Sequence, residues 1–589
     1  MSAPRARAGA CVLLLAFFMQ GYFSLIQKSV TVDEMVYITA GYYHLTTGKF
    51  DFNRTNPPLA KLISASPLLI LDLELPEITS DRQEWNEVDQ WKYAREFLYF
   101  NTTDAKVILQ YARLTILVLG TLFGFYLFAF VRGQWGNLTA VCAVGFYAFS
   151  PNLIAHSRLA TQDFLLAVWV FLAIVAFWRI STQPTLRNTL LIGLWIGLAA
   201  ATKTSTVFLA VALAGIALWR IYSDSSALRW TSLSFIKRLP TNLLQQTATV
   251  TGIAIIVSVI VLFVLNAVYY FEGTGHPLSA YVTASQLEQR IPHAAPLLIP
   301  ILNLPLPLPE GLVELLRFQV GRVSGGNSLF FMGELSNSGW WYMMPVAFLI
   351  KTPVSLLIAV LVALVSWLRG NQSANCFETA AAITISVFII GFSALSSVSI
   401  GIRYILPAYP FLCVLAGIGT ARLLNTPGLL FPVTGGVLLA WQMTASLVIF
   451  PHYLAYFNLL IGGPQNGYKY LVDSYLDWGQ DLPALRDYMD DRGLESINLG
   501  YFGSGDPATY GIDYKSMPSV GLAPAGGGAD WWYASSPDNY PPIQYPLAVS
   551  ATLLGGVFIP TYYKELRDHP PDAQVGYSIL IFESPPESQ

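Results

Sequence analysis

Charged side chains are scarce in this chain. Asp, Glu, Lys and Arg together make up 12% of its 589 residues, whereas soluble domains contain roughly 25%. The chain also has no excess of positive charge, since its formal net charge is -3. Nucleic-acid-binding proteins need a basic surface that neutralises phosphates, so the composition argues against a nucleic-acid partner. The high hydrophobic content of 54% instead indicates an integral membrane protein.

Cysteine is rare as well. The four cysteines lie in or beside apolar runs and none lies in the long polar segments; they are Cys11, Cys142, Cys376 and Cys413. A disulfide framework or a thiolate metal site is therefore not expected.

The hydrophobic residues are grouped in long runs. A run of about 20 apolar residues is long enough to cross a bilayer, and the sequence contains about eleven candidates. They are residues 8–26, 107–131, 138–152, 163–180, 189–201, 205–220, 246–268, 341–368, 379–396, 404–421 and 429–450. The predicted fold class is thus an all-α polytopic membrane protein. Because no small-residue cleavage site follows the first run, we predict that it is a retained signal anchor.

The short loops between these runs differ in charge. With the N-terminus in the cytoplasm, alternate loops carry the excess of Arg and Lys that the positive-inside bias requires, namely Arg132, Arg179, Arg187, Arg220, Arg229, Lys237, Arg238, Arg369 and Arg422. The long polar segments 28–106, 269–340 and 451–589 then share the extracytoplasmic side. We therefore expect a transmembrane domain over residues 1–450 and a small C-terminal extracytoplasmic α/β domain over 451–589.

Secondary structure can be predicted within these outer segments. In the first segment, residues 36–45 are predicted to form an amphipathic helix on the membrane surface, and residues 59–71 an interfacial or re-entrant helix. In the last segment, a helix is predicted from Asp481 to Arg492, where Gly493 stops it. Strands are predicted at 496–502, 530–535, 547–552 and 576–582.

Two adjacent acids, Asp33 and Glu34, follow the first apolar run, and the sequence Asn56-Pro-Pro-Leu-Ala-Lys61 lies shortly after them. Together they resemble the acidic pair and the His-Pro-Pro-Leu-x-Lys signature of the GT-C glycosyltransferases, in particular the protein O-mannosyltransferase-like members of glycosyltransferase family 39. Residues 158–163, 331–342, 351–353, 403–407 and 472–482 resemble further motifs of the family and of its bacterial phospholipid-carrier-dependent members. Asn56 stands where the family often has His, so no role for an imidazole is carried over.

The resemblance implies a GT-C fold and a reaction. One sugar, mannose or another hexose or pentose, would move with inversion from a polyprenyl-phosphate carrier to a protein, glycolipid or polysaccharide acceptor at the extracytoplasmic face of the bilayer. A lipid phosphate leaves readily, so we predict no cofactor and no dependence on a divalent cation. The tail motifs favour the bacterial plasma membrane, with the endoplasmic reticulum membrane as the alternative.

Each candidate residue has an expected role in that reaction. A general base must lie within hydrogen-bond reach of the acceptor hydroxyl, and we assign this role to Asp33, with Glu34 orienting Asp33 or the acceptor. Asp163 is expected to hold acceptor or sugar, or to pair with Arg158, and Glu334 to touch the acceptor or to tie a loop. The predicted ligands of the donor phosphate are Lys61, Arg158, Lys203 and Arg403, because each is expected at an outer membrane boundary. The simpler alternative for each is a solvated boundary residue.

Three acids of the tail, Asp473, Asp477 and Asp481, are spaced at four-residue intervals. Gly479 favours a turn over a helix here. A calcium site is one possible interpretation; acceptor binding is the more natural hypothesis for the domain, and structural support is the simplest one.

Two other classes of function stay open. Secondary transporters place ionisable residues near the bilayer midplane and usually show internal repeats, whereas this chain shows no evident repeat and its acids cluster outside the apolar runs. A membrane scaffold without catalysis would leave the Asp33 pair unexplained.

Overall fold

The computed structural model describes residues 1–77, 87–182, 185–223, 243–282, 285, 296, 299–325, 327–369, 377–398, 400–521 and 540–585. Within these ranges eight helices are long and apolar enough to cross a membrane, or nine if a bent pair is one broken span. The eight are α1 (Ala3–Leu25), α5 (Ala105–Ala148), α7 (Asp163–Thr182), α9 (Val207–Ser223), α10 (Leu243–Val268), α16 (Phe377–Ala394), α17 (Tyr409–Asn425) and α18 (Leu430–Val448). The bent pair is α14 (Met343–Lys351) with α15 (Val354–Arg369), which meet at 106°.

Helix α5 is a hairpin and not one rod. Its 44 residues are interrupted at Gly136, which has φ 85° and ψ 179°. The Tyr147 hydroxyl donates a hydrogen bond to the Gly120 carbonyl at 2.6 Å, although a straight helix would separate these residues by about 40 Å. The predicted runs 107–131 and 138–152 are the two legs of this hairpin.

The predicted number of about eleven spans differs from the eight or nine found. Two reasons account for the difference: α5 is counted once although it has two legs, and α8 (Leu186–Ala200) has only 15 residues. Every predicted run nevertheless contains a helix.

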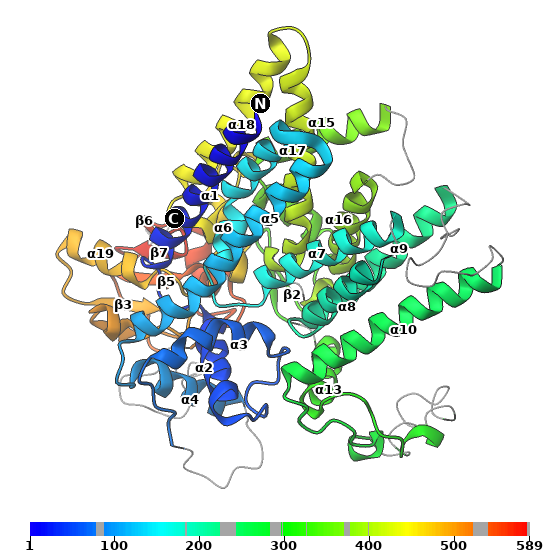
Figure 1. Cartoon of the computed structure of the whole chain (residues 1–589). Coiled ribbons are helices and arrows are strands. Elements are labelled where there is room, and N and C mark those ends of the chain that lie inside the picture. Colours follow the sequence, from blue (N-terminus) through cyan, green and yellow to red (C-terminus); the bar gives the residue numbers. More distant parts are fainter. Residues whose placement is uncertain are drawn as a thin grey trace.

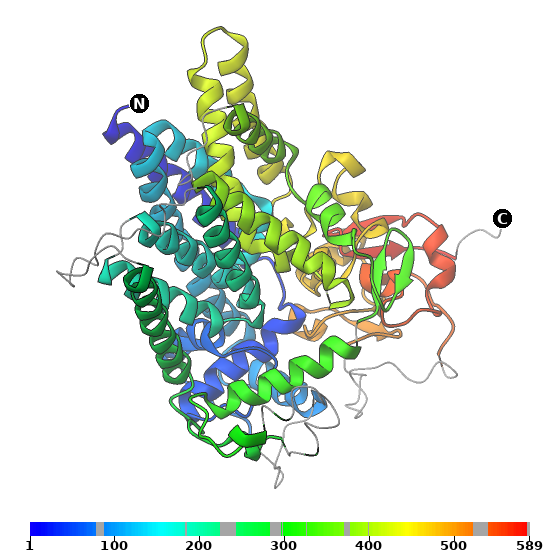
Figure 2. The same cartoon turned by 90° about the vertical axis from the view of Figure 1, so that its right-hand side faces the viewer.

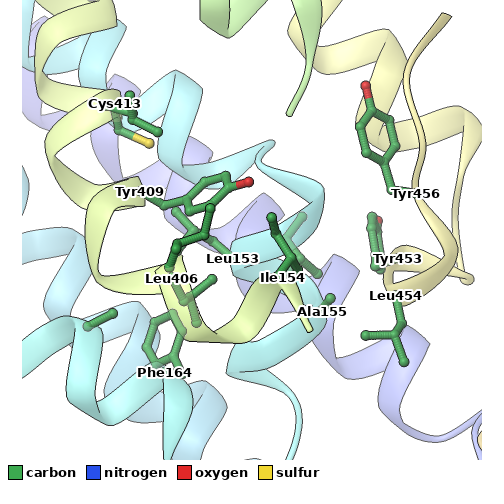
Figure 3. Close-up of a cluster of buried hydrophobic side chains, with 14 of the residues drawn as sticks. Leu153, Ile154, Ala155, Phe164, Leu406, Tyr409, Cys413, Tyr453, Leu454 and Tyr456 are labelled. Atoms are coloured by element: carbon green, nitrogen blue, oxygen red, sulfur yellow. The ribbon is translucent and has the colours of Figure 1, made fainter. Parts of the chain in front are cut away.

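Helix α17 lies at the centre of the helical domain, where it packs against α5 and α15. The approach to α15 depends on Gly419, since a Cβ there would lie 2.2 Å from the Ala359 carbonyl oxygen. Figure 3 shows the buried side chains below this helix, where Leu153 and Ile154 of the short helix α6 (Pro151–Ser157) lie between Tyr409 and Tyr453. This packing fixes α6, from which the chain runs directly into Arg158 and Asp163.

The first outer segment forms α2 (Val32–Thr47), α3 (Leu59–Ala65), a 3₁₀ turn η1 (Ser66–Ile70) and α4 (Glu87–Tyr99). Helix α2 begins with a capping box of Thr31 and Glu34 and ends at Gly48 in the left-handed region. The prediction that this helix lies on the membrane surface is wrong, because all its residues from Val32 to His44 except Asp33 are buried. A Cβ at Gly41 would lie 2.1 Å from the Lys61 carbonyl oxygen, so this glycine lets α3 cover α2.

The tail folds as a small α/β unit. Its five-stranded sheet has the order β4-β3-β5-β7-β6, in which β3 is parallel to β4 and β5, and β7 is antiparallel to β5 and β6. The elements are α19 (Leu482–Arg492), β3 (Ile497–Gly500), β4 (Tyr514–Ser516), β5 (Leu547–Ser550), α20 (Ala551–Gly555), β6 (Ala573–Val575) and β7 (Ile579–Phe582). Three predicted strands and the predicted helix are confirmed; the strand predicted at 530–535 lies outside the described residues.

The tail and the first outer segment pack against each other. The Ser29 amide donates to the Gln480 carbonyl and the Val32 amide to the Trp478 carbonyl, each at 3.0 Å. Figures 1 and 2 show the N-terminus and the loop between α17 and α18 toward the top of the molecule, α2 in its lower half, and the sheet to one side between them. This arrangement places the start of α2 directly beside residues 472–481.

Candidate functional site

Asp33 lies in the first turn of α2, with its carboxylate at the helix N-terminus. Its Oδ2 accepts a hydrogen bond from Arg403 Nη1 at 2.8 Å and faces the Tyr37 hydroxyl at 3.5 Å. The side chain is 24% exposed. Asp33 is therefore the member of the acidic pair that a substrate can reach.

Glu34 is fully buried and engaged on both oxygens. Arg113 donates through Nε and Nη2 at 2.9 and 2.6 Å, and the amides of Ala160 and Thr31 donate at 2.8 and 3.0 Å. Burial alone would raise the pKa of Glu34, but Arg113 outweighs it and holds the pKa below its ordinary value. The expectation that Glu34 orients an acceptor does not fit this geometry. Glu34 fixes the start of α2, and thereby the position of Asp33.

Arg403 lies in the 3₁₀ helix η6 (Ile402–Ala408), which leads into α17. Its guanidinium lies 4.2 Å from the centre of the Trp478 ring and 5.6 Å from that of Tyr404. Its Nε is buried and has no hydrogen-bond partner among the residues that the structure describes. The residue thus joins the helical domain, α2 and the tail at one point.

Asp163 and Lys203 form a second ion pair in the same region. Lys203 Nζ donates to Asp163 Oδ1 at 2.6 Å and lies 4.4 Å from the Tyr404 ring centre. Tyr404 consequently contacts both Lys203 and Arg403 through cation–π interactions. The pairs Asp33–Arg403 and Asp163–Lys203 are therefore parts of one cluster.

Several buried polar atoms around this cluster have no hydrogen-bond partner in the described part of the chain: Nδ1 and Nε2 of His156, Nε and Nη1 of Arg158, Oδ2 of Asp163 and Nε of Arg403. Buried polar groups are normally paired with protein or water. Burial lowers the pKa of His156 to about 3, so this imidazole is neutral near pH 7. A group of unpaired buried donors and acceptors such as this is typical of a site that takes a polar ligand or ordered water.

Lys61, a predicted phosphate ligand, is placed differently. Its Nζ donates to the carbonyls of Asn53 and Asn56 at 2.6 and 3.0 Å, and the side chain is buried. Burial lowers its pKa to about 7. Asn56 in turn donates to the Tyr37 hydroxyl at 3.2 Å. Lys61 thus closes the loop beside the Asp33 site and does not itself contact the cluster.

Glu334 is exposed at the end of a hairpin formed by β1 (Leu329–Phe331) and β2 (Glu334–Ser336). The hairpin is fixed to the tail, because the Met332 amide donates to the Tyr470 carbonyl at 3.0 Å. Within the described residues, Glu334 makes no ion pair with the cluster.

Sequence reasoning missed Arg113, His156, Tyr404 and Trp478. Arg113 had a signal, since it is the only charged residue in the run 107–131 and a charge inside a span usually has a specific partner. The aromatic residues had none, because nothing in the sequence separates them from the many other interfacial aromatics.

The three tail acids do not form a metal site. Asp477 accepts from the Thr552 amide at 3.0 Å, Asp481 pairs with Lys28, and Asp473 accepts from the Ser474 amide. Over the part of the chain that the structure describes, no group of three or more His, Cys, Asp or Glu residues is arranged to hold a metal ion. The calcium interpretation of these acids is therefore wrong.

Comparison with protein families gives one match. The model described as dolichyl-phosphate-mannose-protein mannosyltransferase matches residues 106–236. This segment contains Arg113, Arg158, Asp163 and Lys203 of the site. Over this segment the match agrees with the family that the sequence motifs resemble. No curated protein matches the chain.

Solved structures with similarity to the chain include three whose TM-scores lie between 0.42 and 0.45. The archaeal oligosaccharyltransferase AglB from Archaeoglobus fulgidus is 11% identical over 83% of this chain and 62% of its own, with a TM-score of 0.42. ArnT from Cupriavidus metallidurans is 12% identical over 98% of both chains, with a TM-score of 0.44. The protein O-mannosyltransferase Pmt1-Pmt2 complex of S. cerevisiae is 12% identical over 77% of this chain and 90% of its own, with a TM-score of 0.45. This chain thus spans 62% of the archaeal enzyme, and we transfer no residue role from structures this distant.

Proposed function

We propose that this chain, as a member of the mannosyltransferase family that its residues 106–236 match, is a GT-C membrane glycosyltransferase. It would move one sugar from a polyprenyl-phosphate carrier to an acceptor at the extracytoplasmic face, in a bacterial plasma membrane by preference. The observation that carries this proposal is the ion pair between Asp33 and Arg403 at 2.8 Å. It brings a reachable carboxylate and a cation suited to a phosphate into one site.

The proposed reaction is a single displacement. Asp33 accepts the proton of the acceptor hydroxyl, and the hydroxyl oxygen attacks the anomeric carbon of the donor sugar. The bond between that carbon and the phosphate oxygen breaks, and its electron pair leaves with the lipid phosphate. Attack opposite to the leaving group inverts the anomeric centre.

The leaving phosphate gains negative charge in this step. Preorganised cations stabilise such a charge most when they are held in place before the reaction. Arg403, Lys203 and Arg158 would supply them. Arg403 is held by Trp478 and Lys203 by Asp163, and two donors of Arg158 have no partner among the described residues. Lys61 would act on the donor only indirectly, by holding the loop of Asn53 and Asn56 in place. We retain Glu334 as a proposed contact of the acceptor.

The test uses the purified chain in detergent with a panel of polyprenyl-phosphate sugars. Both donor binding and release of free polyprenyl phosphate are measured. Release with one member of the panel identifies the sugar and establishes the enzyme class. Tight binding of a sugar that has no lipid phosphate, with no binding of any lipid-linked donor, would favour a transporter and contradict the proposal.

A further inference from the structure

Asp473 has an unusual backbone conformation. It begins the 3₁₀ turn η10 (Asp473–Tyr475) with φ at +55°, a region that residues other than glycine seldom adopt and that is often associated with functional sites. Its amide donates to Thr552 Oγ1 at 3.0 Å, and its Oδ1 accepts from the Ser474 amide at 2.5 Å. The tail thus holds this carboxylate in one orientation.

The same turn is fixed to the helix that carries Arg403. Ser474 Oγ donates to the Ile400 carbonyl at 2.5 Å, two residues before η6 begins, and Trp478 stacks on the Arg403 guanidinium. Asp473 consequently interacts electrostatically with both Arg403 and Asp33, although it forms no ion pair of its own within the described residues. The tail therefore adds a third carboxylate to the site.

Burial raises the pKa of Asp473 to about 6; Arg403 opposes this rise and Asp33 adds to it. Asp473 is then mostly ionised at pH 7.5 and mostly neutral at pH 5. The titratable and charged groups that interact with it are Arg403, Asp33, Tyr475 and Asp477.

When ionised, Asp473 is a further negative charge that interacts with Arg403, in addition to the ion pair of Arg403 with Asp33. The two lipid ligands of the proposed reaction differ in charge: the donor is a phosphodiester with one negative charge, whereas the spent carrier is a monoester whose second proton has a pKa of about 6. A fixed negative charge beside Arg403 therefore opposes the product more strongly than the donor.

We propose that Asp473 is a positioning residue which weakens the hold of Arg403 on the spent lipid phosphate and so promotes product release. The inference rests on the proposed function, because it requires the donor phosphate to bind at Arg403. It gives the C-terminal domain a part in turnover.

The test measures binding of farnesyl phosphate, a short lipid phosphate monoester, to the full-length protein in detergent. At pH 7.5, Asp473→Asn should bind it more tightly by on the order of tenfold, the size expected for two like charges about 10 Å apart at an effective dielectric of about 20. At pH 5 the difference between the two proteins should disappear, because Asp473 is then neutral in the wild type. Asparagine tolerates the left-handed conformation, so the variant keeps the turn.

Three further variants make the result decisive. Asp487→Asn, on the exposed face of α19, should bind as the wild type does, and Asp473→Glu, which retains the charge, should stay close to it. Arg403→Ala should weaken binding. Unchanged or weaker binding by Asp473→Asn, with Arg403→Ala still weakened, would overturn the inference alone. Unchanged binding by Arg403→Ala would instead contradict the phosphate site of the proposed function.

Discussion

The two adjacent acids at the start of α2 have opposite surroundings. Neighbouring residues on a helix point about 100° apart, so only one of them can face the buried Arg113. Glu34 does so with both oxygens, while Asp33 turns toward Arg403 and remains accessible. The sequence identified the two acids but could not show which of them is buried and which is accessible. That difference depends on Arg113, nearly 80 residues later in the chain.

The Glu34–Arg113 pair provides a stability prediction. Arg113→Met should leave Glu34 buried without a cation, at a cost of about 3–5 kcal/mol, and should clearly lower the midpoint of thermal unfolding in detergent, followed by tryptophan fluorescence. The matched control is Arg486→Gln, whose ion pair with Asp490 is exposed and should be worth less than about 1 kcal/mol. Equal midpoints for the two variants would show that the buried pair does not stabilise the fold.

A positive charge at a predicted membrane boundary correctly indicated some residues of the cluster but not others. Lys203 and Arg403 do lie in the cluster. Each stands at the start of a 3₁₀ helix, where Lys203 pairs with Asp163 and Arg403 pairs with Asp33. Lys61 has the same sequence signal, but its ammonium is taken by the carbonyls of Asn53 and Asn56. Backbone carbonyls leave no trace in the sequence, so this difference could not have been predicted.

At the scale of elements, the helices of the membrane domain could be predicted from apolar runs. The breaks and turns between them could not. Gly136 separates the two legs of α5 in a conformation available essentially only to glycine. The burial of α2 was not predicted either. The helix α3 that covers it has only 7 residues, and the tail residues that pack against it are more than 400 residues away in the sequence.

Gly136→Ala should destabilise the protein by about 1–3 kcal/mol, since the alanine must adopt the strained conformation. Gly133→Ala is the matched control. Neither glycine has an atom within 4 Å of an added Cβ, and only Gly136 has a positive φ. We expect a lower unfolding midpoint for Gly136→Ala and an unchanged or higher one for Gly133→Ala. The same midpoint for both would argue against the hairpin.

For the whole molecule, the link between the membrane domain and the tail is the main architectural feature. Lys28, just after α1, forms a buried ion pair with Asp481 at the start of α19. Burial alone would raise the pKa of Asp481, but Lys28 and His452 hold it well below its ordinary value. The sequence predicted both domains from composition, yet it could not show that this acid joins them.

Asp481→Asn should loosen the tail, because it leaves the Lys28 ammonium buried without its counter-charge. Limited trypsin digestion should then cut residues 451–589 several times faster than in the wild type. The Glu583→Gln variant, which loses only the exposed ion pair with Arg492 and keeps every trypsin site, should be cut at the wild-type rate. Equal digestion of all three proteins would show that the pair does not anchor the domain.

The positive-inside bias predicts which end of the molecule faces out. In a background with Cys11→Ser and Cys376→Ser, Asp487→Cys in the tail should react with a membrane-impermeant maleimide in intact cells. Arg187→Cys, in a predicted cytoplasmic loop, should react only after permeabilisation. The reverse pattern would move the Asp33 site to the cytoplasmic face.

The central claim is that Asp33 is the base of a sugar transfer from a lipid phosphate. The most direct measurement is the rate of polyprenyl phosphate release under single-turnover conditions, with donor and acceptor saturating, for the wild type and for Asp33→Asn. General base catalysis contributes typically 10²–10⁴-fold, so we expect a loss of at least about 100-fold with donor binding and the unfolding midpoint preserved. A variant that keeps more than about a tenth of the wild-type rate would contradict the account.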